Sequence, residues 1–321
     1  MRRPSAVAAV LLLGVGLGSG IGWALYQGSA GGLESRKGRL HQAAPTPAGT
    51  DDVSDLFELT LRSSTGSVVR AMLRVPRGGS PPYPAVVLVG GMELGRRVAA
   101  LKGLDAIARY AMIVSPDYPI QIDPRSLEGF GLLGAGPRLR SAAFDLVAQI
   151  GLQVDYLLSR RDVARDRVFL VGSSFGAPAV VIAGGVDPRP AAVIALYGGG
   201  GVGSLVAHVL QRGGQEAVSP WRAAVVGRGL ALLLAPLEPT RYAGRIAPRP
   251  VLMVNGADDS LIPRSSVDAL YEAARQPKEI LWVRGEHVHP DETDLIGAVS
   301  GWIAAWLAKR GLLPPEALLG G

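Results

Sequence analysis

The fold is decided by the stretch Val168-Phe169-Leu170-Val171-Gly172-Ser173-Ser174-Phe175-Gly176-Ala177-Pro178-Ala179. Its first four residues are apolar, which is typical of a strand buried in a sheet. The chain then passes through a short turn of small residues and enters a run rich in Ala and Val that can continue as a helix. The stretch therefore predicts a strand, a tight turn and a helix in direct succession.

The turn in this stretch has the pattern Gly-x-Ser-x-Gly, centred on Ser174. Such a turn is so tight that only small residues fit at Gly172 and Gly176, and the strained serine projects its hydroxyl above the carboxyl edge of the sheet. The helix that follows points its N–H groups at the place where an oxyanion would form. The pattern predicts a serine nucleophile, and the alternative interpretation is a Gly- and Ser-rich turn without chemistry.

These residues resemble the α/β-hydrolase family of serine hydrolases, in particular the dienelactone-hydrolase-like and prolyl-oligopeptidase-like catalytic domains. The resemblance covers roughly residues 55–310 and is most specific over 168–179 and 248–290. Members of this family carry a nucleophile, an acid and a histidine in that order along the chain. The resemblance therefore implies an acid and then a histidine downstream of Ser174.

The predicted nucleophile needs a base, because a serine hydroxyl attacks poorly unless its proton is removed, and histidine suits that task near neutral pH. The chain has histidines at positions 41, 208, 287 and 289. The first lies in a predicted linker and the second in a predicted cap, which leaves the segment Gly285-Glu286-His287-Val288-His289-Pro290. The resemblance places the catalytic histidine in this segment, and the Gly-x-His spacing favours His287. We expect His289 to be a surface residue or to support the site from outside.

The histidine in turn needs a carboxylate that fixes its tautomer and stabilises its charged form. The segment Asn255-Gly256-Ala257-Asp258-Asp259-Ser260-Leu261-Ile262-Pro263 resembles the family's Gly-x-x-Asp loop, in which a proline follows four residues after the acid. This match predicts Asp259 as the acid. Asp258 is the competing candidate, and we expect its carboxylate to accept hydrogen bonds from N–H groups of the loop.

Backbone N–H groups are expected to form the oxyanion hole. One donor should be the N–H of Phe175, directly after the nucleophile. The resemblance implies a second donor in the loop after the strand at 85–89, namely the N–H of Met92. Gly90-Gly91 stands where the family usually has His-Gly, which leaves Gly91 as the alternative second donor.

Apolar runs and alternating patterns place the other elements of the sheet. Residues 56–62 and 69–75 alternate on either side of a turn, which predicts an N-terminal antiparallel hairpin. Strands that alternate with helices along the rest of the chain imply a mostly parallel, doubly wound sheet. The predicted strands are 85–89, 111–115, 168–171, 191–196, 251–255 and 279–283, of which 85–89, 168–171 and 191–196 are predicted to be buried. The predicted helices are 97–109, 139–158, 176–183, 265–274 and 295–307, the last with its tryptophans on the inner face.

Residues 202–238 interrupt this alternation. A Gly-rich run at 198–201 precedes two apolar stretches with helical potential, 202–210 and 221–234. The resemblance implies a small helical cap here, between the strand after the nucleophile and the strand that carries the acid. We expect the Gly-rich run to act as a hinge into the cap.

The N-terminus is predicted to direct export. Two arginines precede an uncharged run that is most apolar over 6–25 and long enough to just span a bilayer. Residues 1–30 are therefore predicted to be a cleaved signal peptide or an N-terminal membrane anchor. Either would place the domain outside the cytoplasm, in the periplasm or medium or anchored to the cytoplasmic membrane. Residues 31–54, rich in Gly, Ser, Pro and Ala, are predicted to be a flexible linker before a hydrolase domain at 55–312.

The composition excludes several classes of site. The chain has no cysteine, which excludes disulfides, thiolate metal sites and a cysteine nucleophile. Its net charge is +6, but no basic cluster is interleaved with aromatic side chains, so we expect no nucleic-acid partner. The sequence has no clustered His or carboxylate pattern and no dinucleotide-type glycine motif, so we expect no metal and no cofactor.

These patterns together predict a serine hydrolase of carboxylesterase type. Ser174 would attack the carbonyl of a small-molecule acyl substrate, His287 would move the proton, and Asp259 would orient His287. One alternative is a serine peptidase of prolyl-oligopeptidase type. The other is a binding protein that keeps the fold without turnover. The patterns predict no particular oligomeric state.

Overall fold

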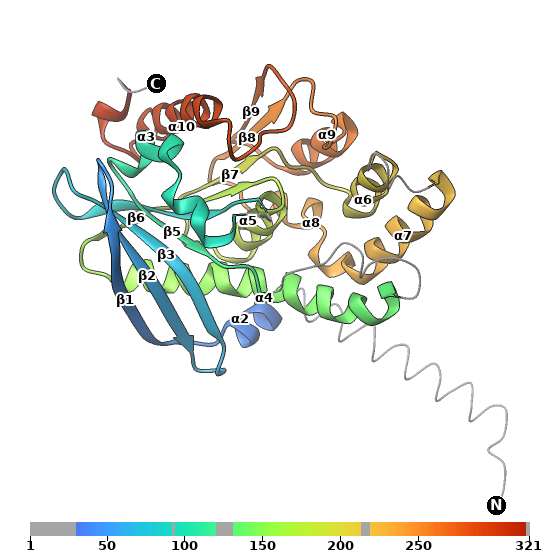
Figure 1. The fold of residues 1–321 in the computed structure, drawn as a ribbon, viewed down its shortest axis with the longest axis horizontal. Coiled ribbons are helices and arrows are strands. Elements are labelled where there is room, and N and C mark those ends of the chain that lie inside the picture. The colour runs from blue at the N-terminus through green and yellow to red at the C-terminus, as the bar shows by residue number, and fades with distance from the viewer. Residues whose placement is uncertain (1–29, 92–93, 120–130, 213–218, 319–321) are drawn as a thin grey trace, which may run out of the picture.

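Nine strands form one sheet within the part of the chain that the structure describes (Figure 1). That structure is a computed structural model, and the described residues are 30–91, 94–119, 131–212 and 219–318. The strands lie in the order β1-β2-β3-β5-β4-β6-β7-β8-β9. Strands β1 to β3 are antiparallel to their neighbours, whereas β4 to β9 run parallel to one another. They span Leu40–Thr50 (β1), Ser54–Ser63 (β2), Val68–Pro76 (β3), Tyr83–Val89 (β4), Met112–Pro116 (β5), Val163–Ser173 (β6), Ala192–Leu196 (β7), Val251–Gly256 (β8) and Lys278–Val283 (β9).

Helices cover both faces of the sheet. Neighbouring residues of a strand point to opposite faces, so Phe169 of β6 packs with α10 while Leu170 packs with α4 and α5. Because residues 168–171 of β6 are buried on both faces, this part of the strand is a continuous apolar run. The predicted mostly parallel, doubly wound sheet with an N-terminal antiparallel hairpin is confirmed. The helices span Ala30–Lys37 (α2), Asp105–Ala108 (α3), Gly131–Ser159 (α4), Gly176–Val186 (α5), Val202–Gln211 (α6), Pro220–Leu233 (α7), Thr240–Ala243 (α8), Arg264–Ala273 (α9) and Thr293–Ala308 (α10), with 3-10 turns at Gly95–Ala100 (η1), Lys102–Leu104 (η2), Ala235–Leu237 (η5) and Pro315–Leu318 (η6).

The structure differs from the predicted flexible linker at 31–54. Helix α2 packs on α4, and β1 pairs antiparallel with β2 from Leu40 opposite Ser63 to Thr50 opposite Asp55. Most side chains of β1 are exposed, and two of its residues are prolines, as is usual for a strand at a sheet edge. Backbone hydrogen bonds to β2 hold this segment, and these bonds do not depend on which side chains it carries. Its sequence therefore lacks the apolar alternation that would have predicted a strand.

The predicted export segment at 1–30 lies outside the described residues except for Ala30, which begins α2. Within the described ranges, no helix has the length and apolar character needed to cross a membrane.

The segment at 97–109 is less regular than the single helix that its spacing predicts. It contains the end of η1, then η2 and the short α3. Leu101 separates the two 3-10 turns with an extended backbone, at φ −65° and ψ 130°. Because the apolar residues on both sides of Leu101 are buried against the sheet, the spacing resembles that of one helix.

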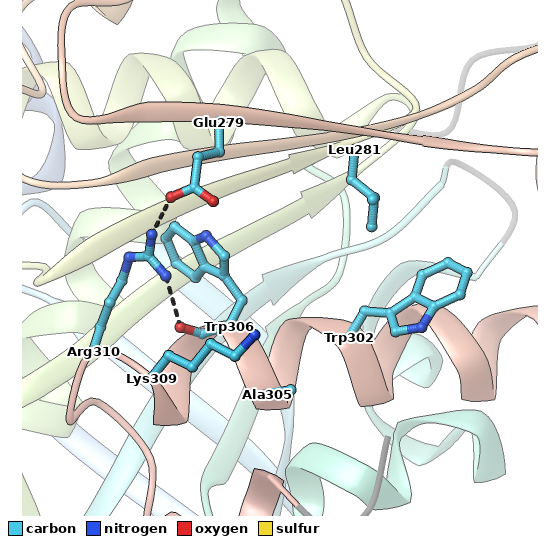
Figure 2. Close-up of a pocket in the computed structure, with 7 residues that line it drawn as sticks. All are labelled: Glu279, Leu281, Trp302, Ala305, Trp306, Lys309 and Arg310. Atoms are coloured by element: carbon cyan, nitrogen blue, oxygen red, sulfur yellow. Dashed lines mark hydrogen bonds and ion pairs between the residues drawn. The ribbon is translucent and has the colours of Figure 1, made fainter.

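The closing helix α10 places its two tryptophans differently. Trp306 is 8% exposed and lies under the guanidinium of Arg310, whose central carbon is 3.9 Å from the ring centroid. Trp302 is 42% exposed. Figure 2 shows Trp302 with Leu281 at one end of a groove of about 590 Å³ between β9 and α10, and Trp306 with Arg310 and Glu279 at the other. The prediction that the tryptophans of this helix face inward is therefore right only for Trp306.

Arg74 of β3 ties the antiparallel strands to the segment before α3. It is fully buried, and its guanidinium lies 3.0 Å from the carboxylate of Asp51 and also pairs with Asp105. Its Nε donates a hydrogen bond to the hydroxyl of Ser54 at 2.9 Å. A buried arginine and its partners stabilise the fold only when all of them are present. Removing one of them leaves the charges and polar groups of the others without a partner.

Replacing Arg74 with Met should lower the free energy of unfolding by about 3 kcal/mol, because Ser54 and the two carboxylates lose their common partner. Urea denaturation followed by circular dichroism measures this. The control is Arg77→Met, since Arg77 is exposed and its Nε is 3.6 Å from the Asp55 carboxylate. That change should cost less than about 0.5 kcal/mol, and equal losses for the two variants would contradict the role given to Arg74.

Candidate active site

Ser174 lies in a strained turn between β6 and α5. Its φ is 53°, and Ser174 and Tyr197 are the non-glycine residues with positive φ among those described. The N–H of Ser174 donates a hydrogen bond to the carbonyl oxygen of Leu196 at 2.8 Å. A Cβ atom at Gly172 would clash with the carbonyl of Gly176, and one at Gly176 would clash with the carbonyl of Val89. The turn is as tight as the pattern predicts, and its two glycines have no substitute.

The structure brings Ser174, His287 and Asp259 together. His287 Nε2 is 2.9 Å from Ser174 Oγ, and His287 Nδ1 is 2.8 Å from Asp259 Oδ2. An ionised carboxylate only accepts hydrogen bonds, so Nδ1 carries the proton and Nε2 is left to accept the serine hydroxyl. The side chains of His287 and Asp259 are largely buried. This arrangement can take the proton from Ser174 as its oxygen attacks a carbonyl.

Asp259 is held by its own loop. Its Oδ1 accepts hydrogen bonds from the N–H groups of Leu261 at 2.9 Å and Ile262 at 2.8 Å, which leaves Oδ2 for His287. The adjacent carboxylate of Asp258 is exposed and accepts the N–H of Gly285 at 3.3 Å. The structure therefore places Asp259 at the histidine and Asp258 at the backbone of the histidine loop.

The other histidines lie away from Ser174. His289 is exposed, and its backbone N–H donates to Glu292 Oε2 at 2.6 Å. His41 is exposed on β1. His208 lies on α6, where its Nε2 is 2.9 Å from the carbonyl oxygen of Ser260. This last contact joins the predicted cap to the loop that carries Asp259.

Only part of the predicted oxyanion hole lies within the described residues. Met92 lies outside the described residues, whereas Gly91 is described, and a Cβ atom there would be 4.0 Å from the Cβ of Ser174. Phe175 directly precedes α5, where the first N–H groups of a helix have no partner within the helix. Gly91, in the loop after β4, therefore lies beside the serine.

Tyr118 contacts both the loop after β4 and Phe175, the residue after the nucleophile. No sequence pattern singled it out. Its hydroxyl donates a hydrogen bond to the carbonyl oxygen of Gly90, and its ring meets the ring of Phe175 edge to face at 5.4 Å between centroids. Burial raises the pKa of the Tyr118 hydroxyl, so it stays a donor. The sequence feature that could have pointed to Tyr118 is its position in the loop that follows β5.

Tyr197 is a second neighbour that the sequence did not single out. It follows β7 directly, is buried, and its ring lies edge to face with the imidazole of His287 at 5.5 Å between centroids. Burial and the carboxylates of Glu292 and Asp259 raise its pKa to about 12. Its hydroxyl has no hydrogen-bond partner within the described ranges. A strained φ and a buried polar group next to His287 are features that cluster at functional sites.

The Gly-rich run before the cap is anchored, although its glycines predicted a hinge. The carboxylate of Glu238 accepts the N–H of Gly201 at 2.8 Å and that of Val202 at 3.0 Å, at the start of α6. The N–H of Gly198 donates to the side-chain oxygen of Asn255 at 3.1 Å. Helices α6 and α7 lie at the predicted cap position and pack on each other. The start of the cap is therefore held by Glu238 at the end of the cap, and the run before it by Asn255 of β8.

Comparison with sequence families gives one match. The family model described as Serine hydrolase (FSH1) matches residues 191–299, a range that includes Asp259 and His287 and begins after Ser174. A search of curated proteins gives no match.

Comparison with solved structures gives many similar folds. Acetyl xylan esterase 1 from Thermoanaerobacterium sp. JW/SL YS485 has a TM-score of 0.59 at 16% identity, with 83% of this chain and 90% of that chain covered. The acetyl xylan esterase from Paenibacillus sp. R4 has a TM-score of 0.60 at 17% identity, covering 84% and 92%. The α/β hydrolase GrgF from Penicillium sp. sh18 has a TM-score of 0.55 at 14% identity, covering 84% and 99%. The chain has the α/β-hydrolase fold, and its resemblance to the serine hydrolases of that fold is confirmed.

Replacing Gly176 with Ala should destabilise the protein by about 2 kcal/mol, because the new methyl group meets the backbone of β4 and the turn must shift. The matched control is Gly229→Ala, at an exposed position in α7 where a Cβ atom would meet nothing within 4 Å. That change should stabilise the protein by about 0.5–1 kcal/mol. Urea denaturation of both variants measures the difference, and an equal response would contradict the tight turn.

Proposed function

We propose that this chain is a serine hydrolase that cleaves carboxylic esters of small molecules, with Ser174 as nucleophile, His287 as base and Asp259 as the residue that orients His287. The observation that carries the proposal is the pair of hydrogen bonds from Ser174 Oγ to His287 Nε2 at 2.9 Å and from His287 Nδ1 to Asp259 Oδ2 at 2.8 Å. The serine hydrolase family model and the esterases among the similar structures support the same chemistry.

In the first half-reaction, Ser174 Oγ attacks the ester carbonyl while its proton passes to His287 Nε2. The imidazolium that forms is stabilised by the carboxylate of Asp259. Collapse of the tetrahedral intermediate breaks the bond to the alcohol, which takes the proton from His287 as it leaves. The acyl group is then attached to Ser174. In the second half, His287 activates a water that attacks this acyl-enzyme and releases the acid.

The charge that develops on the carbonyl oxygen needs hydrogen-bond donors already in place. We assign one donor to the N–H of Phe175, since it directly follows the nucleophile at the start of α5. The second donor is assigned to the loop after β4, as the N–H of Met92 or of Gly91. The short separation between Gly91 and Ser174 supports this assignment.

Export to the periplasm or medium, or anchoring at the cytoplasmic membrane, remains part of the proposal. Its support is the sequence of residues 1–30 alone, in which two arginines precede an apolar run.

The first test is labelling with a fluorophosphonate, which reacts with an activated serine. Wild type should be labelled, while Ser174→Ala and His287→Ala should not, because the nucleophile or its base is missing. Ser173→Ala is the matched control and should be labelled like wild type. A folded wild-type protein that takes up no label would contradict the proposal.

The assignment of the acid is tested separately by hydrolysis of a p-nitrophenyl ester. Asp259→Asn should lower kcat by roughly ten-thousandfold, because an amide favours the wrong tautomer of His287. Asp258→Asn should change kcat by less than about tenfold, since Asp258 contacts the loop backbone instead of the imidazole. The reverse order of the two effects would assign the acid to Asp258.

Tyr118→Phe should lower kcat for the same ester by about tenfold with little change in KM, because Gly90 loses the hydrogen bond that positions the loop beside Ser174. Circular dichroism confirms that the variant is folded. A rise in KM with unchanged kcat would instead indicate that Tyr118 binds the substrate directly.

A further inference from the structure

Helix α7 of the cap has apolar side chains on two opposite faces. Ala223, Gly227 and Leu230 are buried on the inner face. A Cβ atom at Gly227 would clash with the backbone of Gly203, so α6 and α7 are in close contact there. A helix that already buries one apolar stripe needs no second one for folding. Apolar side chains on the outer face of α7 are therefore not needed for folding.

The outer face carries large exposed side chains. Trp221 is 66% exposed, Val225 is 59% exposed and Leu232 is 80% exposed. Together with Arg228 they follow one another at spacings of four, three and four residues, which places them on one side of the helix. Exposed apolar side chains gathered in this way mark a surface that meets a partner. We call these three apolar residues and Arg228 the outer stripe.

The charged residues described on the two cap helices have one sign. The described residues of the two cap helices, 202–212 and 219–233, contain no Asp and no Glu. Arg222 and Arg228 are exposed on α7, and the guanidinium carbon of Arg222 lies 5.4 Å from the centroid of the Trp221 ring. Arg212, also exposed, follows α6. A tryptophan, aliphatic residues and arginines on one exposed helix face match a helix that lies in the interface of an anionic bilayer.

Helix α7 and the first described helix, α2, both contact α4. Helix α4 contacts both neighbours: Arg140 donates a hydrogen bond to the carbonyl oxygen of Leu233 in α7, and Asp145 pairs with Arg36 of α2 at 2.6 Å. Figure 1 shows α2 and α7 against the same helix α4. The segment predicted to direct export to or through a membrane therefore joins the domain beside the cap.

We propose that the outer face of α7 docks on an anionic lipid surface, with Trp221, Val225 and Leu232 entering the interface and Arg222 and Arg228 meeting the lipid phosphates. A second copy of this chain fits less well, because a symmetric contact through α7 would bring these arginines together with no carboxylate on the helix to offset them. The docking does not depend on ester hydrolysis. It would place the cap, and the loop of Asp259 that His208 contacts, at the membrane surface.

The test uses the absence of cysteine from the chain. Val225→Cys in the full-length protein is labelled with an environment-sensitive nitrobenzoxadiazole dye. The matched control is Val68→Cys at the start of β3, a valine that is 44% exposed and lies outside the cap. Each labelled protein is mixed with phosphatidylglycerol vesicles or with phosphatidylcholine vesicles. Probes at single positions are needed because residues 1–30 are expected to bind vesicles on their own.

With phosphatidylglycerol vesicles, the dye at position 225 should shift its emission to shorter wavelength and brighten by roughly twofold or more, since it leaves water for the interface. The dye at position 68 should not respond, and phosphatidylcholine vesicles should give a weaker effect at position 225. No response at position 225, an equal response at position 68, or equal responses to both kinds of vesicle would overturn the proposal. A response at position 225 in concentrated protein without vesicles would assign the face to a second copy.

Three further variants in the Val225→Cys background test the contributions of the stripe and the arginines. Leu232→Ser should abolish the response, whereas Val68→Ser should leave it intact. Arg222→Gln with Arg228→Gln should remove the preference for phosphatidylglycerol. Hydrolysis of a soluble ester should be unchanged in these variants, because none of the residues contacts Ser174 or His287. Retention of the lipid preference without both arginines would contradict the electrostatic part of the proposal.

Discussion

The left-handed backbone of Ser174 is the constraint on which the rest of the site depends. The conformation is held from both sides, by the hydrogen bond of the Ser174 N–H to Leu196 and by the two glycines that let β4 and α5 approach. It turns the hydroxyl out of the sheet at the carboxyl ends of the parallel strands, where loops from several strands meet. Strands β7, β8 and β9 follow β6 in spatial order. The loops after β8 and β9 can therefore deliver Asp259 and His287 to the same place.

Hydrogen bonds between the acid loop and the histidine loop fix the distance between those two side chains. The N–H of Asp258 donates to the carbonyl of Gly285 at 3.1 Å, and the N–H of Ser260 donates to Glu286 Oε2 at 2.8 Å. That N–H holds the pKa of Glu286 below its usual value, so the carboxylate stays an acceptor. The carboxylate of Asp258 also accepts the N–H of Gly285 at 3.3 Å, so the two adjacent carboxylates of this loop have different partners. One of them aligns the loops and the other contacts the imidazole.

The cap extends this arrangement outward. Glu238 holds the start of α6, and His208 connects α6 to Ser260, so the cap is joined to the loop of the acid. The inner face of α7, with Ala223, Gly227 and Leu230, packs on α6. The outer stripe is exposed and has arginines beside it. A contact at the outer stripe would therefore be separated from Asp259 by α6 and Ser260 alone. This connection links the proposed docking surface to the proposed chemistry without making either depend on the other.

The sequence by itself determined the features that depend on residues adjacent to one another along the chain. Runs such as 168–171 are apolar at every position because the strand is buried on both faces, and the small residues of the turn after them predicted the position of Ser174. Asp259 and His287 were singled out because their segments resemble the family's acid loop and histidine segment, and each lies in a loop directly after a strand. The tertiary structure alone decided which residues from distant segments surround them. Tyr118, Tyr197 and Arg74 have no local pattern, because each acquires its partners from other strands and loops, and β1 is a strand only because the edge of β2 pairs with its backbone.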